Sequence, residues 1–524
     1  MLYYLSGMSK ISGIDRTQTS AFPITLEEMI PEDHPARVID AYIEGLDLVA
    51  LGFIQKGHSI EGRPGYDTKV LLKIYLYGYL NRIRTSRLLE RECKRNVELI
   101  WLIGGLRPCF RTIAGFRSDN VSALENLFRS FVQLLRTWNL FGASTVAIDG
   151  TKLRAVNSKK NNYNPNKIER QLEYIDNRIT TYLTEMEKAD AAEDHEAADT
   201  CNAELITQLN RKRKYHDLAE QLKQSGHTQV STTDPDARSM IIHGQVVEVC
   251  YNIQTAVDDK HCLIAHYQVT NENDRKALVP AAVATKSILK AEAINVLADK
   301  GYDNDEQLHE CAAQQIITYV AQQDIPRKNP VPTEAYYGDK FIYDPNTDTY
   351  VCPAGETLKT PGTWYEKKYK HYVTPVKHYR TGKCKTCPVR EQCTTNPNGR
   401  IIERSKYTEA AQANAERIKI QKHIYQKRQQ IVEHVFGTIK RQWGFDHILL
   451  KGLEKNHGEL GLIYLTYNLR RVLNIIGAKE LINRLKMVYS SAFTLSIPIR
   501  CNRTEKLYER LRLQLGFYNV MLVL

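Results

Sequence analysis

Residues 144–149 of the chain are STVAID, an apolar and β-branched run that ends in a carboxylate. A second run of this kind, INVLAD, occupies residues 294–299. Short runs rich in Val and Ile are typical of buried strands. The sequence therefore predicts two buried strands whose apolar runs deliver Asp149 and Asp299 at their tips, with the first strand continuing to Ala155.

A third acidic residue, Glu433, lies in a different context. The stretch from Lys406 to Phe436 contains no Pro and is rich in Ala, Gln, Arg, Lys and Glu, which predicts a helix. Taken singly, an Asp at a strand end is most often a turn or capping residue, and a Glu on a charged helix is most often solvated. Three carboxylates from two strands and one helix, however, suit two Mg²⁺ or Mn²⁺ ions about 3.5–4 Å apart, which stabilise the charge that develops in phosphodiester cleavage.

The residues around these acids resemble those of a known family. The phrases AIDGT at 147–151, ADKGY at 298–302 and VEHVFGTIK at 432–440 are similar to those of the DDE transposases of bacterial insertion sequences, in the IS-eleven-eighty-two group. The resemblance covers about Ser9 to Ala478. It implies an α/β fold with a ribonuclease-H-like mixed sheet flanked by helices, in which the first two Asp residues and the Glu bind the metal ions. Asp258, Asp259, Asp274 and Asp303 are rival carboxylates that turns and helix caps explain more easily.

Related transposases also carry a Tyr, Arg, Glu, Lys signature around the Glu. Lys440 matches at seven residues after Glu433, and Tyr425 and Arg428 are the nearest candidates before it, with Arg428 one residue farther away than the signature has it. Seven residues are about two helical turns, so Glu433 and Lys440 project from nearly one face. On that face the Glu would hold metal while Lys440 and Arg441 reach DNA phosphates. The spacing alone favours the alternative of a solvated amphipathic helix.

Composition sets the outer limits. The chain has 524 residues, 42% of them hydrophobic and 25% charged, as in ordinary globular proteins of several domains. A formal net charge of +12 favours a polyanionic partner. No apolar run approaches the ~20 residues of a membrane span, and the first residues lack a signal-peptide core. We expect a cytoplasmic protein with no membrane partner, nucleoid-associated when bound to DNA, and Met8 as a plausible start.

The chain divides into five expected parts. Residues 9–141 are predicted to form a helical N-terminal DNA-binding domain, and its alternative is a helical domain that supports the core and has a basic surface. Residues 142–322 and 405–480 would form the catalytic domain. An inserted helical hairpin is expected at 160–225 and a cysteine-containing insertion at 323–404, while 481–524 is an unassigned tail.

The basis for the DNA-binding domain is a cluster of nine cations, Arg82, Arg84, Arg87, Arg91, Lys94, Arg95, Arg107, Arg111 and Arg117. The basis for the hairpin is a heptad series, Ile168, Leu172, Ile175, Ile179, Tyr182 and Met186, followed by a second segment from about Glu193 to Lys223.

The cysteine-containing insertion holds four of the eleven cysteines, Cys352, Cys384, Cys387 and Cys393. A Cys-x2-Cys pair beside two further cysteines is typical of a structural Zn²⁺ site, although the five residues before the last cysteine make the spacing loose. Reduced thiols are the main alternative, and disulfides are disfavoured in the cytosol.

These features predict a metal-dependent transposase that cuts the ends of an insertion sequence and joins the freed 3′-hydroxyls to target DNA. Its partner is double-stranded DNA, and we expect a homo-oligomer when it is bound there. Two alternatives stay open. One is a non-catalytic DNA-binding descendant of a transposase, and the other is a nuclease without a strand-transfer step. Trp443 is a candidate for stacking on a flipped base, but a core Trp is the more common case.

Overall fold

The computed structural model describes residues 25–55, 65–243, 246–322, 331–368 and 373–495. The chain forms two compact units, divided between Phe116 and Arg117 and again between Arg471 and Val472. The expected start at Met8 and the tail beyond residue 495 lie outside the described ranges. No helix within these ranges is long and apolar enough to cross a membrane.

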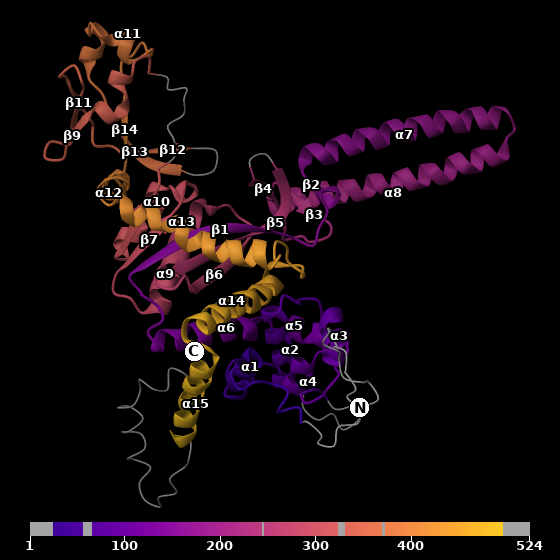
Figure 1. Ribbon diagram of the computed structural model, residues 1–524. Helices are drawn as coiled ribbons and strands as arrows, with labels where there is room; N and C mark the ends of the chain where they lie inside the picture. The colour runs from indigo at the N-terminus through magenta and orange to yellow at the C-terminus, as the bar shows by residue number, and fades with distance from the viewer. Residues whose placement is uncertain (1–24, 56–64, 244–245, 323–330, 369–372, 496–524) are drawn as a thin grey trace, which may run out of the picture. The chain divides into compact units, whose positions relative to one another are not determined.

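The first unit is built from helices (Figure 1). They are α1 (Pro35–Glu44), α2 (Thr68–Leu80), α3 (Ser86–Arg95), α4 (Val97–Leu102), α5 (Phe110–Asp119), which runs on past the boundary, and α15 (Ala478–Leu495). Helix α2 is buried along most of its length, and the hydroxyl of Tyr75 donates to the carbonyl of Ile113 at 2.7 Å. Of its two lysines, Lys73 is buried and forms ion pairs with Asp40 at 2.6 Å and Glu44 at 2.7 Å. The first part of the tail is therefore helical and packs against α1.

The cations expected to contact DNA divide by exposure. Arg84 and Arg117 are buried, at 6% and 5% exposed, whereas the other seven side chains of the set are exposed. Three of these, Arg91, Lys94 and Arg95, form ion pairs with Glu90 or Glu92 on the same helix. The surface charge available to a polyanion is thus smaller than the sequence count indicates.

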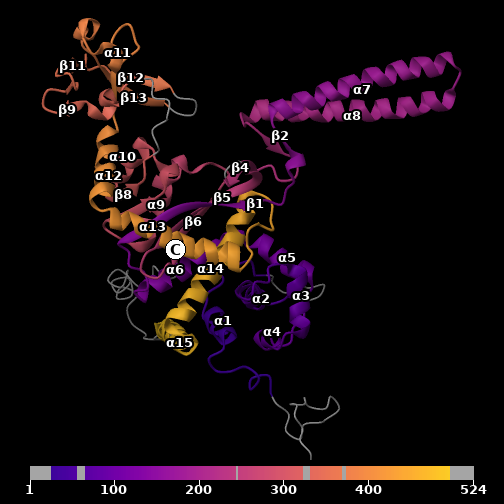
Figure 2. The ribbon, with the colours of Figure 1, turned by 45° about the horizontal axis from the view of Figure 1, so that its top comes forward.

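The second unit contains a mixed six-stranded sheet (Figures 1 and 2). Its strands are β1 (Thr145–Arg154), β4 (Arg238–His243), β5 (Val246–Asp258), β6 (Ile264–Thr270), β7 (Ile294–Ala298) and β8 (Ile316–Val320). The order is β4-β5-β1-β7-β8, with β6 also paired to β5. Strand β1 is antiparallel to β5 and parallel to β7, and β7 is parallel to β8. The chain is therefore a mixed α/β protein, as expected.

Helices pack on this sheet. They are α6 (Val121–Thr137), α9 (Leu278–Leu289), α10 (Asp305–Ala313), α12 (Thr408–Ile420), α13 (Lys422–Phe436) and α14 (Leu453–Ile476), with 3₁₀ turns η2 (Asp274–Lys276) and η3 (Lys300–Tyr302). The expected helix from Lys406 to Phe436 is two helices that break at Gln421, and a π-helical turn, η7 (Gly437–Gln442), follows it. Helix α13 lies against β1, β5 and β7.

Two buried asparagines complete the edges of the sheet. Asn468 of α14 accepts from the backbone N–H of Ile264 and donates to its carbonyl, both at 2.8 Å. Asn414 of α12 makes the same pair with Val320, at 2.9 and 2.7 Å. Each amide side chain thus replaces a missing strand and satisfies backbone groups that would otherwise be buried without partners.

Two further substructures branch from the second unit. Helices α7 (Pro165–Ala191) and α8 (His195–Ser225) run side by side (Figures 1 and 2), and all six positions of the heptad series are buried or half-buried. Short strands β2 (Asn162–Tyr163) and β3 (Val230–Ser231) pair at their base.

The cysteine-containing segment holds two small antiparallel sheets. Its remaining elements are η4 (Glu334–Tyr336), η5 (Gly338–Lys340), β9 (Ile342–Asp344), β10 (Thr349–Val351), β11 (Thr357–Lys359), β12 (Tyr365–Lys368), β13 (Val373–Tyr379), η6 (Gly382–Thr386), α11 (Arg390–Cys393) and β14 (Ile402–Ser405), and η1 (Lys159–Asn161) precedes β2.

Candidate active site

The sheet brings two of the predicted acids together. Strands β1 and β7 are parallel with Ala147 opposite Leu297, the last pair of the ladder. The chain reaches Asp149 and Asp299 two residues later on each side, and the charge of Asp299 acts on the Asp149 carboxyl. Neighbouring strands lie about 4.8 Å apart, and residues two apart share a face. Asp299 follows β7 directly, as predicted, but Asp149 lies in the middle of β1 because that strand continues to Arg154.

Each of these carboxylates is fixed by one backbone N–H. Asp149 Oδ1 accepts from Gly150 N, and Asp299 Oδ1 accepts from Gly301 N, both at 2.8 Å. The second oxygen of Asp149 lies 3.5 Å from Arg428 Nη1 of α13. Burial, together with the negative charges of Asp299 and Asp274, raises the pKa of the Asp149 carboxyl to about 7, although the Arg428 charge and the Gly150 N–H oppose the shift. Carboxylates are thus held near one another at an electrostatic cost.

The third predicted acid, Glu433, lies on the helix that flanks β1. Its side chain is exposed and accepts from Gln429 Nε2 at 2.7 Å. Five residues earlier Arg428 reaches Asp149, and seven residues later Lys440 donates to Thr151 Oγ1 at 3.2 Å and to the Lys152 carbonyl at 3.1 Å. The helical segment between those two contacts, which includes Glu433, therefore runs alongside β1. In the described part of the chain, Glu433 forms no hydrogen bond or ion pair with either aspartate.

The four candidates for DNA contact differ in their surroundings. Arg428 is 21% exposed and faces a carboxylate. Lys440 is directed into the sheet, and burial lowers the pKa of its ammonium group. Tyr425 is half-buried, one turn before Arg428, and Arg441 is exposed. Arg441 is therefore the member of this set whose cation is most accessible to a phosphate.

Trp443 is a core residue. It is 8% exposed and packs edge-on against Phe445, with ring centroids 5.7 Å apart. The ring of Tyr467 lies 6.3 Å away on α14. The indole thus supports the packing of α14 on the turn after α13, which is the more common of the two roles expected for it.

The four cysteines of the insertion line one cavity, together with Glu356, Lys383 and Arg400. All four are free thiols, and burial raises the pKa of Cys393. Beside the cavity Phe341, Tyr350, Leu358, Tyr379 and Ile402 form a small apolar core. Among the residues that the structure describes, no three His, Cys, Asp or Glu side chains are grouped as a metal site. This applies to the cysteines and to the predicted acids alike.

The donor chemistry nevertheless fits a hard cation at the aspartate pair. Asp149 and Asp299 present carboxylate oxygens, the ligands that Mg²⁺ and Mn²⁺ prefer. Within the described ranges, the second oxygen of Asp299 has no hydrogen-bond donor. A cation between the two groups would offset the repulsion that raises the Asp149 pKa.

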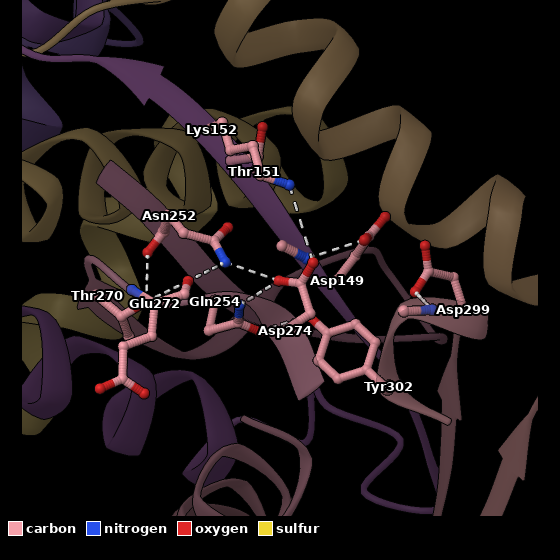
Figure 3. Close-up of polar contacts among 12 residues, drawn as sticks. Asp149, Thr151, Lys152, Asn252, Gln254, Thr270, Glu272, Asp274, Asp299 and Tyr302 are labelled. Atoms are coloured by element: carbon pink, nitrogen blue, oxygen red, sulfur yellow. Dashed lines mark hydrogen bonds and ion pairs between the residues drawn. The ribbon is translucent and has the colours of Figure 1, made fainter. Parts of the chain in front are cut away.

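One residue ranked low in the sequence lies at this site. Asp274, the first residue of η2, has its Oδ1 within 2.7 Å of both Asn252 Nδ2 and Gln254 Nε2 (Figure 3). Its Oδ2 lies 3.9 Å from Lys152 Nζ. The sequence favoured a turn or capping role for Asp274, because turns and helix caps explain it more easily. Its partners Asn252 and Gln254 lie on β5 and are placed beside Asp149 only by the β1–β5 pairing.

Comparison with known proteins gave two family matches. A family model described as a transposase DDE domain matches residues 351–473, and one described as a transposase domain (DUF772) matches residues 24–119. The first match includes Glu433 and the four cysteines, and the second includes α1 to α5. No curated protein and no solved structure matches the chain. The two matches support an insertion-sequence transposase, which implies DNA as the partner and a DNA-cleaving enzyme as the class.

Proposed function

We propose that this chain is a DDE transposase of the IS-eleven-eighty-two group that cuts element ends and joins the freed 3′-hydroxyls to target DNA. Asp149, Asp299 and Glu433 would hold two Mg²⁺ or Mn²⁺ ions. The observation that supports the proposal is the parallel β1–β7 pairing up to Ala147 and Leu297, two residues before the aspartates, together with the packing of the helix that bears Glu433 against β1. The strand order β6-β5-β1-β7-β8, antiparallel on one side of β1 and parallel on the other, supports a ribonuclease-H-like sheet.

Bound divalent ions supply charge stabilisation for the attacking and leaving oxygens of an in-line displacement at phosphorus. The protein's own residues prepare that site. The Gly150 and Gly301 N–H groups orient the two aspartates, and Arg428 balances part of the Asp149 charge. Glu433 would turn from Gln429 toward the aspartates, a change of side-chain rotamer on a helix that already lies against β1.

The remaining parts are proposed to serve DNA. Residues 9–141 would recognise the element ends through their exposed cations, and Arg441 would contact a phosphate near the acids. Tyr425, Arg428 and Lys440 would support that contact. The hairpin at 160–225 and the segment at 323–404 are proposed insertions in a catalytic domain of 142–322 and 405–480. In the latter insertion Zn²⁺ and reduced thiols are the two candidates, and cysteines that form no disulfide fit both.

The experiment is end cleavage on a plasmid that carries the coding sequence with its natural flanking DNA. Wild type should nick the element ends only with Mg²⁺ or Mn²⁺ present. Asp149→Asn, Asp299→Asn and Glu433→Gln should each lose cleavage by at least 10²-fold while DNA retention in a gel-shift assay stays unchanged. The exposed Glu416→Gln on α12 is the matched control and should cleave as wild type does.

The outcomes separate the alternatives. Metal-independent binding without cleavage by wild type would identify the non-catalytic descendant. Cleavage without joining of supplied pre-cut ends to a target plasmid would identify a nuclease. Full cleavage by any of the three acid variants would remove that residue from the site.

A further inference from the structure

We propose that Asp274 is a fourth carboxylate of the candidate active site and presents its Oδ2 atom to the cation shared by Asp149 and Asp299. The inference rests on the proposed function, because it adds a ligand to the same site. It concerns a residue outside both family matches and outside the predicted set of three acids.

The orientation of Asp274 is set by a buried network (Figure 3). Asn252 and Gln254, at 0% and 1% exposed, project from one face of β5 and both donate to Asp274 Oδ1 at 2.7 Å. Gln254 in turn accepts a hydrogen bond from the buried hydroxyl of Tyr302, and Asn252 also donates to the Glu272 carbonyl at 2.9 Å. Two amide donors to one oxygen fix the carboxylate and leave Oδ2 directed away from the network.

Oδ2 is directed toward the aspartates. A Cβ placed on Gly301 would lie 2.9 Å from Asp299 Oδ1 and 3.6 Å from Asp274 Oδ2. One carbon-sized position therefore contacts both carboxylates. Helix capping does not account for the position of Asp274, because the N-cap residue of the 3₁₀ turn η2 is Asn273.

The glycine after Asp149 reflects the same arrangement. A Cβ on Gly150 would lie 2.2 Å from Asp274 Oδ1 and 2.9 Å from Asn252 Oδ1. Only glycine at this position lets the Asp274 carboxylate approach β1 so closely. Asn252 Oδ1 is also buried and has no hydrogen-bond donor among the described residues. An unpaired buried amide oxygen beside an approaching carboxylate is a costly combination that a cation or its bound water would relieve.

A variant at Lys152 should change cation binding in the opposite direction from a variant at Asp274. The ammonium of Lys152 lies 3.9 Å from Asp274 Oδ2. In the β1–β5 ladder, Lys152 is the residue opposite Asn252. If Oδ2 faces a bound cation, the lysine competes with that cation for the same oxygen. Removing the ammonium should then strengthen cation binding, whereas removing the carboxylate should weaken it.

The test measures Mn²⁺ binding to the full chain without DNA, by electron paramagnetic resonance of free Mn²⁺ and by the Mn²⁺-induced rise in melting temperature. Asp274→Asn keeps the shape and should weaken binding at least tenfold. The control Glu272→Gln removes an exposed charge two residues away and should stay within about threefold of wild type. Lys152→Met should strengthen binding several-fold, and this gain should disappear when Asp274→Asn is also present.

The results distinguish a failure of the proposed function from a failure of the proposed role of Asp274. If wild type and Asp149→Asn both fail to bind Mn²⁺, the proposed function fails and this inference fails with it. If wild type binds, Asp149→Asn does not, and Asp274→Asn binds as wild type does, Asp274 is no ligand and the three-acid site stands. If Asp274→Asn does not fold, the Lys152→Met variant decides, since unchanged binding there overturns the proposal.

Discussion

The change Asn414→Ala tests how α12, the helix before the one that bears Glu433, is anchored to the sheet. Asn414 and Val320 are both fully buried, and the amide makes two hydrogen bonds with the Val320 backbone at 2.9 and 2.7 Å. Alanine removes both partners and leaves one N–H and one carbonyl without water or protein to bond. Each buried group left unpaired costs about 1–3 kcal/mol, so we expect the two groups together to cost about 2–6 kcal/mol.

That loss is large beside the 5–15 kcal/mol by which domains are usually stable. The substitution should open the edge strand β8 before the rest of the sheet. Strand β8 pairs with another strand, β7, on one side only, and Asn414 bonds Val320 of β8 in place of a strand on the other side. Native-state hydrogen exchange reports such local opening directly. Since 1.4 kcal/mol corresponds to a factor of ten, protection of the 316–320 amides should fall on the order of 10¹- to 10⁴-fold.

Two controls bound the interpretation. Gln412→Ala changes an exposed side chain on the same helix and should leave both exchange and melting temperature nearly unchanged. Asn414→Asp still accepts from the Val320 N–H but repels its carbonyl, so it should resemble alanine. A fall in protection of less than about fivefold for Asn414→Ala would refute the view that this amide holds α12 to the sheet.

Three further predictions follow from other contacts. Gly461→Ala places a Cβ 3.0 Å from the Leu124 carbonyl and 2.9 Å from the Tyr267 hydroxyl, so it should lower stability by about 1–3 kcal/mol through overpacking, and a melting temperature equal to wild type would contradict this. Hydrogen bonds from Lys377, Tyr379 and Tyr343 lower the pKa of Asp348. The stability they add is therefore present above the unfolded-state pKa of about 3.9 and lost as the pH falls through the lower folded value. Acid unfolding of the 331–405 segment, followed by Trp364 fluorescence below about pH 4, should lose this component in Asp348→Asn. Hydrogen bonds from Thr112 lower the pKa of the exposed Cys109 thiol, so among the cysteines that the structure describes it should react first with a disulfide reagent at neutral pH, and Cys109→Ser should remove that fast phase.

The sequence predicts those elements whose pattern is local. The β-branched runs mark β1 and β7, and the heptad series marks α7, because burial on one face requires that periodicity. The break at Gln421 leaves no comparable trace, since Gln, Glu, Arg and Lys occur on both sides of it. Burial of Arg84 and Arg117 is equally invisible, because it depends on residues distant in the chain.

The site divides along the same line. Asp149 and Asp299 are predictable because each ends an apolar run, and their closeness follows from the parallel pairing of those runs. The present orientation of Glu433 toward Gln429 is a rotamer choice that no sequence pattern records. The position of Asp274 depends on Asn252 and Gln254, which reach the site only through the register of β5 on β1.

The unequal lengths of two strands explain why acids gather at this place. Strand β1 pairs with β5 from Val146 to Arg154 but with β7 only from Thr145 to Ala147. From Asp149 to Leu153 the edge of β1 therefore has no strand partner among the described residues on the side where β7 ends, and a bridge between Arg154 and His447 closes the edge again. Side chains from the strand, from the turn after β7 and from elements on either face can meet at this opening without crossing the sheet. A longer β7 would close the edge with backbone hydrogen bonds, so the early end of this strand, as much as the acids themselves, creates the candidate site.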